Sequence, residues 1–292
     1  MQVLDLWNNN KTPTISFELF PARSEKGAEK LEQVIGDLAG LQPNFVSVTL
    51  GAGGSTREGS RQLLDKLMNE KGLEVIAYFA GYGLGPDDIT SVLDSYKDLG
   101  IETILVVRGD PPEEEGFTPH PDSMANASDL ISFIGNRYKF CMGAAGYPEG
   151  HIEAENRQKD IEYLRLKVEN GARYVIANYC YDDQYYFDFV AQCRSNGIDV
   201  PILPGVMPIY SVKMMNMLAK LCGATIAQEI KDGLAKLPPD DKEALENFGI
   251  DLATRQCSEL IKNGVPGIHI YTMDRSKAAL EVVRRLRKEG LL

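Results

Sequence analysis

Residues Phe140–Cys180 read FCMGAAGYPEGHIEAENRQKDIEYLRLKVENGARYVIANYC and contain one complete strand–helix–strand unit. Two short runs rich in apolar and small residues, 140–147 and 174–180, flank an amphipathic stretch over 152–170 that ends just before Gly171. Nearly continuous apolar runs are typical of parallel strands covered on both faces. A glycine after the last helical turn is a common helix stop. The stretch therefore predicts a βαβ unit.

The same alternation runs along almost the whole chain. The predicted strands are Ile15–Phe20, Asn44–Leu50, Leu73–Ala80, Glu102–Gly109, Phe140–Tyr147, Tyr174–Cys180, Pro201–Pro208 and Gly267–Met273. The predicted helices are 24–40, 56–70, 86–99, 123–137, 152–170, 183–196, 210–222 and 276–288. Eight such units favour an α/β fold, a (β/α)8 TIM barrel formed by residues 1–292 as one domain. A doubly wound sheet needs fewer strands than these eight units supply, so it would leave some of the units without a place in the sheet.

Two details refine this prediction. The interval 224–264 is too long for one helix, so we expect extra helices between strands 7 and 8, with a break near Leu237–Asp240. Ser55–Glu58 has the pattern of a capping box at the start of a helix.

Composition excludes several classes of function. The 292 residues include 31 Lys and Arg against 42 Asp and Glu, a net charge of −11. This acidity argues against non-specific binding to nucleic acid or to an anionic membrane. No apolar run approaches the roughly 18 residues of a membrane span, and MQVLDLWNNNKTPT lacks the pattern of a secretory signal. We expect a small soluble partner molecule, without nucleic acid or membrane.

Cysteine and histidine usage points to a cytoplasmic location and no metal. The five cysteines are scattered and form no CxxC pair, which suits a reducing compartment. The three histidines form no HxH or HExxH pattern, so a histidine metal site is not expected.

In a barrel, chemistry is placed where strands run into the following loops. Glu18 lies inside the first predicted strand, where it shares a face with Ser16 and Phe20. A buried carboxylate is either paired, here with Arg23, or held as a proton donor by an environment that raises its pKa. Both interpretations stay open.

The fourth and fifth strands end in further polar groups. Arg108-Gly-Asp110 brings a cation, an uncovered backbone and a carboxylate to the barrel mouth, either for a ligand or as an internal Arg108–Asp110 pair. Tyr147 and His151 flank a rigid turn and could both face a planar ligand, although a lone histidine is often structural.

Other classes of site fit less well. The loop Gly51–Thr56 is either a ligand loop or a plain turn, and it departs from the dinucleotide fingerprint GxGxxG. No predicted strand ends in the lysine that a Schiff-base aldolase needs, and the usual glycine-rich phosphate clamp after strands 7 and 8 is missing. Residue types alone predict an enzyme of unspecified reaction.

Six motifs in chain order resemble the methylenetetrahydrofolate reductase family, bacterial type with a single catalytic barrel. They are Ser16–Pro21, Phe45–Thr49, Arg108–Asp110, Tyr147–His151, Leu203–Pro208 and His269–Thr272. The resemblance covers about the whole chain. It implies a (β/α)8 flavoprotein with FAD, or FMN, that passes a hydride from NADH or NADPH to 5,10-methylenetetrahydrofolate and gives 5-methyltetrahydrofolate. It also implies a homo-oligomer, with a partner reductase subunit as an alternative source of electrons.

The resemblance assigns roles residue by residue. Glu18 resembles the acid that protonates the folate, and Asp110 the carboxylate beside flavin and pterin. Asn178 and Arg275 resemble substrate-binding residues. The positions that resemble flavin contacts are Thr49, Arg108, Gly109, Asp110, Ala127, Tyr147, His151, Ala154, Asp160 and Lys167.

Four positions depart from the family pattern. Leu50 replaces a usual tyrosine, Tyr78-Phe-Ala80 replaces His-Leu-Thr, Asn178 replaces Gln, and Val212 replaces a frequent aromatic residue. These departures keep two alternatives open. One is a divergent member that uses another donor, pterin or direction, and the other is a non-catalytic folate-binding subunit.

Overall fold

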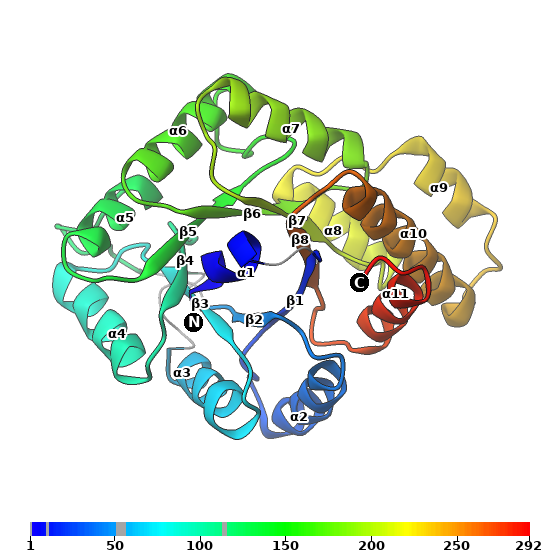
Figure 1. The fold of residues 1–292 in the computed structure, drawn as a ribbon, viewed down its shortest axis with the longest axis horizontal. Coiled ribbons are helices and arrows are strands. Elements are labelled where there is room, and N and C mark those ends of the chain that lie inside the picture. The colour runs from blue at the N-terminus through cyan, green and yellow to red at the C-terminus, as the bar shows by residue number, and fades with distance from the viewer. Residues whose placement is uncertain (1, 10–11, 51–56, 113–115) are drawn as a thin grey trace.

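The computed structural model describes residues 2–9, 12–50, 57–112 and 116–292. Eight parallel strands close into one barrel in which each strand pairs with the next along the chain and β8 pairs with β1 (Figure 1). The strands are β1 Thr14–Leu19, β2 Phe45–Val48, β3 Val75–Ala80, β4 Thr103–Val107, β5 Cys141–Gly146, β6 Tyr174–Tyr179, β7 Ile202–Val206 and β8 Gly267–Tyr271. The predicted TIM barrel is confirmed, because seven of the predicted ranges contain one of these strands and the first, Ile15–Phe20, overlaps β1, which begins one residue earlier.

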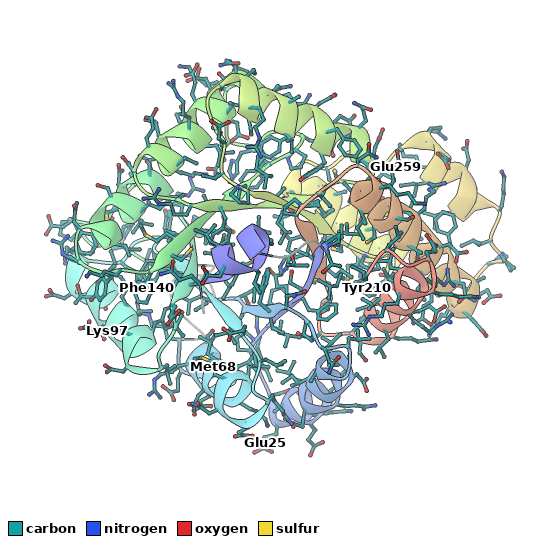
Figure 2. All side chains as sticks on the ribbon, viewed as in Figure 1. Glu25, Met68, Lys97, Phe140, Tyr210 and Glu259 are labelled. Atoms are coloured by element: carbon teal, nitrogen blue, oxygen red, sulfur yellow. The ribbon has the colours of Figure 1, made fainter. Side chains whose placement is uncertain are left out.

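Helices form the outer ring around the strands (Figure 1). They are α2 Glu25–Ala39, α3 Arg57–Asp65 with the π-helical turn η2 Lys66–Glu70, α4 Pro86–Asp98, α5 Ala127–Gly135, α6 Arg157–Glu169, α7 Asp183–Ser195, α8 Val212–Cys222, α9 Gln228–Ala235, α10 Lys242–Lys262 and α11 Lys277–Lys288. The extra helices predicted between strands 7 and 8 are confirmed as α9 and α10. Figure 2 shows exposed side chains on this ring, among them Glu25, Lys97 and Glu259.

Local signals explain several helix ends. Ser24 and Asn156 cap α2 and α6 by accepting hydrogen bonds from the backbone N–H groups of Gly27 and Lys159. Because Asn156 caps α6, this helix begins at Arg157 and not at the predicted residue 152. Ser55 and Thr56 of the predicted capping box lie outside the described residues.

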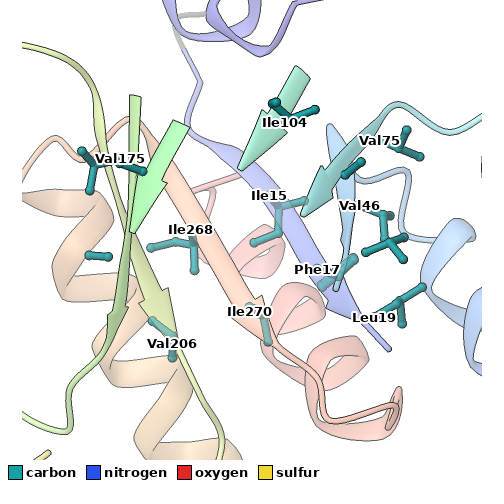
Figure 3. Close-up of a cluster of buried hydrophobic side chains, with 14 of the residues drawn as sticks. Ile15, Phe17, Leu19, Val46, Val75, Ile104, Val175, Val206, Ile268 and Ile270 are labelled. Carbon is teal, nitrogen blue, oxygen red and sulfur yellow. The ribbon is translucent and has the colours of Figure 1, made fainter. Parts of the chain in front are cut away.

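Two apolar layers hold the barrel together. Outward-facing strand residues such as Ile15, Phe17 and Leu19 pack against the helices, and Figure 3 shows this layer. The opposite face of the strands fills the barrel interior with Phe45, Ile76, Leu105, Cys141, Tyr174, Ile176 and Leu203. This alternation turns Ser16 and Glu18 toward the interior.

A short helix, α1 (Val3–Asn9), closes one end of the barrel and was not predicted (Figure 1). Its Trp7 ring lies 6.4 Å from the Phe45 ring and 5.6 Å from the Tyr174 ring. The Trp7 indole N–H donates to the Thr14 hydroxyl at 3.0 Å. Since Thr14 is the first residue of β1, α1 covers the end where the strands begin, and the opposite end is left for the site.

Candidate active site

Glu18 lies near the end of β1, where its side chain is only 5% exposed. The strand register places it between Ser47 of β2 and Tyr271 of β8. The Tyr78 hydroxyl of β3 donates to Glu18 Oε2 at 2.6 Å. Arg23 is exposed, so the alternative of an ion pair between Glu18 and Arg23 is not what the structure shows.

Burial raises the pKa of Glu18 from 4.5 to about 7. The hydrogen bond from Tyr78 opposes this shift because it stabilises the carboxylate, whereas the negative charge of Asp274 adds to it. The side chain can therefore hold a proton near neutral pH and release it there.

The turn after β8 supports Glu18. Met273 and Asp274 have φ values of 50° and 53°, a left-handed conformation that costs a non-glycine residue energy and is found at functional sites. This turn lets Asp274 Oδ1 accept from the Phe20 N–H at 3.0 Å. The Thr272 hydroxyl donates to the Glu18 carbonyl at 2.6 Å. The backbone from Glu18 to Phe20 is thus fixed.

A cavity of about 450 Å³ opens beside strands β4 and β5, over helices α5 and α6. Seven of the ten positions predicted to contact flavin line it, namely Arg108, Ala127, Tyr147, His151, Ala154, Asp160 and Lys167. The structure thus gathers residues that are separated by up to 59 positions in the sequence, 167 − 108 = 59.

Two cations face this cavity. Burial lowers the pKa of Lys167, and the nearby Asp160 carboxylate opposes the shift. Lys167 Nζ donates to the Ala145 carbonyl at 3.4 Å. Arg108 forms an ion pair with Glu153 at 2.6 Å, which raises the pKa of Arg108. The ion pair of Arg108 is therefore with Glu153 and not with Asp110, the alternative left open by the sequence.

Tyr147 and His151 lie together on the wall of the cavity. Their ring centroids are 4.5 Å apart with an interplanar angle of 83°, an edge-to-face contact. The backbone N–H of His151 donates to Asp160 Oδ2 at 3.3 Å, so the turn between β5 and α6 is tied to the helix.

The other three predicted flavin contacts do not line the cavity. Gly109 has a φ of 84° and a Cβ there would lie 3.1 Å from that of Ala80, so this bend of the backbone needs glycine. The bend leaves Asp110 exposed at the mouth. The partly buried Thr49 ends the second strand run, and its carbonyl accepts from Ser60 at 2.8 Å.

The predicted substrate contacts lie on other elements, Asn178 on β6 and Arg275 in the turn after β8. Asn178 sits where the pairing of β6 with β7 shifts register, and its Oδ1 accepts from the Tyr179 N–H at 2.9 Å. Arg275 is exposed, with its guanidinium carbon 5.3 Å from the Tyr210 ring centroid. Val212 is 40% exposed at the first position of α8.

Two residues of the site were missed as functional. Tyr78 was noted only as a departure from the family pattern, although it alternates with Ile76 on the inward face of β3. Glu153 lies in a charged, exposed loop, and nothing in the sequence links it to Arg108.

The residues around the cavity fit a flavin dinucleotide. The volume of the cavity is within the range of cofactor sites. Arg108 and Lys167 offer charge-assisted hydrogen bonds to a diphosphate, and Tyr147 with His151 offers an aromatic wall.

Within the described ranges, no three His, Cys, Asp or Glu side chains are grouped as a metal ion would require. Every described helix is too short or too polar to cross a bilayer.

Comparison with known proteins agrees with this geometry. The chain is 31% identical over 275 residues to the 5,10-methylenetetrahydrofolate reductase of Escherichia coli, which covers 93% of this chain and 90% of that protein. It is 33% identical over 283 residues to methylenetetrahydrofolate reductase (NADH) 1 of Arabidopsis thaliana, covering 93% of this chain and 48% of that protein. The chain spans about half the length of the plant and yeast relatives it matches.

A solved structure shows the same fold. An uncharacterized protein from Clostridium thermocellum that binds two copies of 5-methyl-5,6,7,8-tetrahydrofolic acid superposes with a TM-score of 0.69 at 14% identity, covering 99% of this chain and 100% of that one. The model of the methylenetetrahydrofolate reductase family matches residues 3–287. The chain therefore belongs to the methylenetetrahydrofolate reductase family.

Proposed function

We propose that residues 1–292 form a single catalytic barrel that reduces 5,10-methylenetetrahydrofolate to 5-methyltetrahydrofolate with FAD as cofactor and NADH as electron donor. The observation that carries the proposal is a buried carboxylic acid, Glu18, with a pKa of about 7, in a barrel that also has a cavity suited to a dinucleotide. Family membership and the NADH-type names of the plant relatives support the choice of reaction and donor.

Glu18 supplies the proton of the reaction. Its proton goes to a ring nitrogen of the folate, the adjacent carbon–nitrogen bond breaks, and the methylene carbon becomes an electrophilic iminium. A flavin held by the cavity residues, among them Arg108 and Lys167, would supply the hydride transfer from a reduced nicotinamide to this carbon. Glu18 is left as a carboxylate that accepts the Tyr78 hydrogen bond until it regains a proton.

Residues at the mouth orient and stabilise the folate. Asp110 is exposed there, and its negative charge would stabilise the cationic iminium. Arg275 would bind the acidic side chain of the folate, because its guanidinium is exposed at the mouth and lies over Tyr210. Asn178 would contact the pterin or the nicotinamide after it releases the Tyr179 N–H.

The cavity residues would hold FAD. Arg108 and Lys167 provide two positive charges for a diphosphate, which FMN lacks, so they favour FAD. Ala127 and Ala154 are small and allow close approach, and Thr49 and Gly109 would contact the part of the flavin outside the cavity.

We also propose a cytoplasmic homo-oligomer. The apolar side chains of Val212, Met217 and Leu221 on α8 are 40%, 57% and 65% exposed, and burial against another subunit would remove them from water. The five cysteines are free thiols, as a reducing compartment keeps them.

The visible spectrum of the purified protein tests the proposal. We expect a stoichiometric bound flavin that is released as FAD and is bleached by NADH under anaerobic conditions. A colourless protein that also fails to take up added FAD would contradict the proposal and favour a folate-binding subunit. Bound FAD that only another reductant can bleach would retain the flavin chemistry but replace NADH as donor.

A further inference from the structure

Tyr210 and Arg275 lie together where two paired strands run into their loops. β7 and β8 pair in parallel, with Val206 opposite Ile270. Tyr210 (Figure 2) belongs to the segment after β7, and Arg275 to the turn after β8. The guanidinium carbon of Arg275 lies 5.3 Å from the centroid of the Tyr210 ring, within the range of a cation–π contact.

Tyr210 is held in place at its hydroxyl and at its backbone. The hydroxyl donates to the carbonyl of Tyr271, the last residue of β8, at 3.1 Å. The preceding residue, Ile209, lies so close to α10 that a Cβ at Gly249 would come within 2.4 Å of its carbonyl oxygen. The partly buried Tyr210 ring therefore offers a fixed surface to Arg275.

The Arg275 guanidinium keeps its hydrogen-bond donors available. The side chain is exposed, and across the described residues it has neither an ion pair nor a side-chain hydrogen bond. Contact with an aromatic ring does not use up the five N–H donors, whose planar arrangement matches a carboxylate. Arg275 is thus placed by a ring and left free to bind an anion.

The supports of Tyr210 and Arg275 also contact Glu18. Tyr271, whose carbonyl accepts from Tyr210, is opposite Glu18 in the pairing of β1 with β8. The Thr272 carbonyl accepts from the Arg275 backbone N–H at 3.0 Å, and the Thr272 hydroxyl donates to the Glu18 carbonyl at 2.6 Å. The position of the guanidinium is therefore fixed relative to the buried acid.

We propose that Tyr210 is a positioning residue that makes the site select the acidic side chain of the folate, because it holds the Arg275 guanidinium where that side chain ends. The inference rests on the proposed function, in which Arg275 binds this side chain. The net charge of −11 repels an acidic ligand. A cation at a fixed position offsets this repulsion at the point of contact.

The test compares two ligands that differ only in charge. They are 5-methyltetrahydrofolate and its diamide, in which both glutamate carboxylates are replaced by neutral amides. Their affinities are measured by isothermal titration calorimetry with the protein as purified. Tyr210→Leu should weaken binding of 5-methyltetrahydrofolate by roughly two- to fivefold, the contribution of an exposed cation–π contact, and leave binding of the diamide unchanged. Tyr210→Phe keeps the ring and should lose less.

A double-mutant cycle tests whether Tyr210 acts through Arg275. Arg275→Met should weaken binding of 5-methyltetrahydrofolate by roughly ten- to a hundredfold, and adding Tyr210→Leu should then have no further effect. Phe133→Leu is the matched control, because it removes a ring that lies 3.7 Å from the guanidinium carbon of Arg137 on α5, outside the site. In steady-state folate reduction, Tyr210→Leu should raise KM and leave kcat unchanged.

Three results would overturn the role of Tyr210. They are an unchanged preference for the charged ligand in Tyr210→Leu, an equal loss for both ligands, and a loss in Tyr210→Leu that persists in the Arg275→Met background. An unmodified protein that binds neither ligand would instead contradict the proposed function, and the inference with it. Failure of the inference alone is thus distinguishable from failure of the proposed function.

Discussion

The Tyr78 hydroxyl donates a 2.6 Å hydrogen bond to Oε2 of Glu18 across the barrel interior, from the third strand to the first. This bond joins a residue that departs from the family pattern to the residue proposed as the proton donor. Burial and the hydrogen bond act on Glu18 in opposite directions, and burial dominates, so its pKa is about 7. The position of Tyr78 therefore tunes the acid and does not simply fill the space of the residue it replaces.

Removing the Tyr78 hydroxyl should widen the pH range of folate reduction. The reaction needs protonated Glu18, so its rate falls as pH rises through the Glu18 pKa. Tyr78→Phe raises this pKa, and we expect the alkaline limb of the rate of folate reduction to move up by roughly half to one pH unit. An alkaline limb that stays in place or moves down would contradict this role, and Tyr174→Phe should leave it unchanged.

Glu153 should weaken flavin binding by competing for Arg108. The Arg108–Glu153 ion pair is 2.6 Å long, with the side chains 31% and 55% exposed. Such an exposed pair is worth about 0–1 kcal/mol, so Glu153→Gln should tighten FAD binding by up to roughly fivefold in a fluorescence titration. Glu162→Gln, which breaks the Lys159 ion pair at 2.8 Å on the same loop–helix unit, is the control. Weaker binding in Glu153→Gln would show that Glu153 supports the cofactor instead.

Lys167 should contribute more to FAD than to FMN. A hydrogen bond to a charged group is worth about 1.5–3 kcal/mol, so Lys167→Met should weaken FAD binding by roughly ten- to a hundredfold, and FMN binding by less. Lys159→Met on the same helix should leave both affinities unchanged, because Lys159 pairs with Glu162 and does not line the cavity. Equal losses for FAD and FMN would argue against contact with the diphosphate.

Two buried acids should make the folded protein less stable at alkaline pH. Burial raises the pKa of Glu18 from 4.5 to about 7 and that of Asp183 from 3.8 to about 7. Between the unfolded and the folded pKa values, the folded state binds more protons than the unfolded state. The stabilisation that comes from this difference in proton binding is complete below the unfolded pKa and is lost as pH rises through about 7.

Neutral replacements should remove this loss. Urea denaturation gives the free energy of unfolding of each variant relative to the unmodified protein. For both Glu18→Gln and Asp183→Asn, we expect this difference to favour the variant by about 1–3 kcal/mol more at pH 8 than at pH 5. Asp183 accepts from the Gln256 amide at 3.1 Å and lies outside the cavity, so its variant should leave folate reduction intact. Equal effects at both pH values would mean that these carboxyls titrate normally.

The barrel could be predicted because its signal is repeated. Each strand run is followed by an amphipathic helix, and a closed parallel sheet accommodates eight such units. Helix α1 could not be predicted in this way. It has seven residues, and its position depends on contacts of Trp7 with Phe45 and Tyr174, which are distant in the sequence.

The site could be predicted only in part, for a similar reason. The position and inward face of Glu18 follow from the strand pattern. Its partner does not, since a contact between β1 and β3 depends on the curvature of the closed sheet. The Arg108–Glu153 pair likewise depends on how the loop before α6 folds back, and the sequence alone left only Asp110 open as an ionic partner of Arg108.

The most direct test of the account is to separate the two half-reactions in Glu18→Gln by stopped-flow spectroscopy. Reduction of the bound flavin by NADH requires no proton from Glu18, so we expect it at the rate of the unmodified protein. Reoxidation of the reduced flavin by 5,10-methylenetetrahydrofolate should slow by roughly a hundredfold or more, the usual contribution of a general acid. If both half-reactions kept their rates, Glu18 would not be the proton donor and the central claim would be wrong.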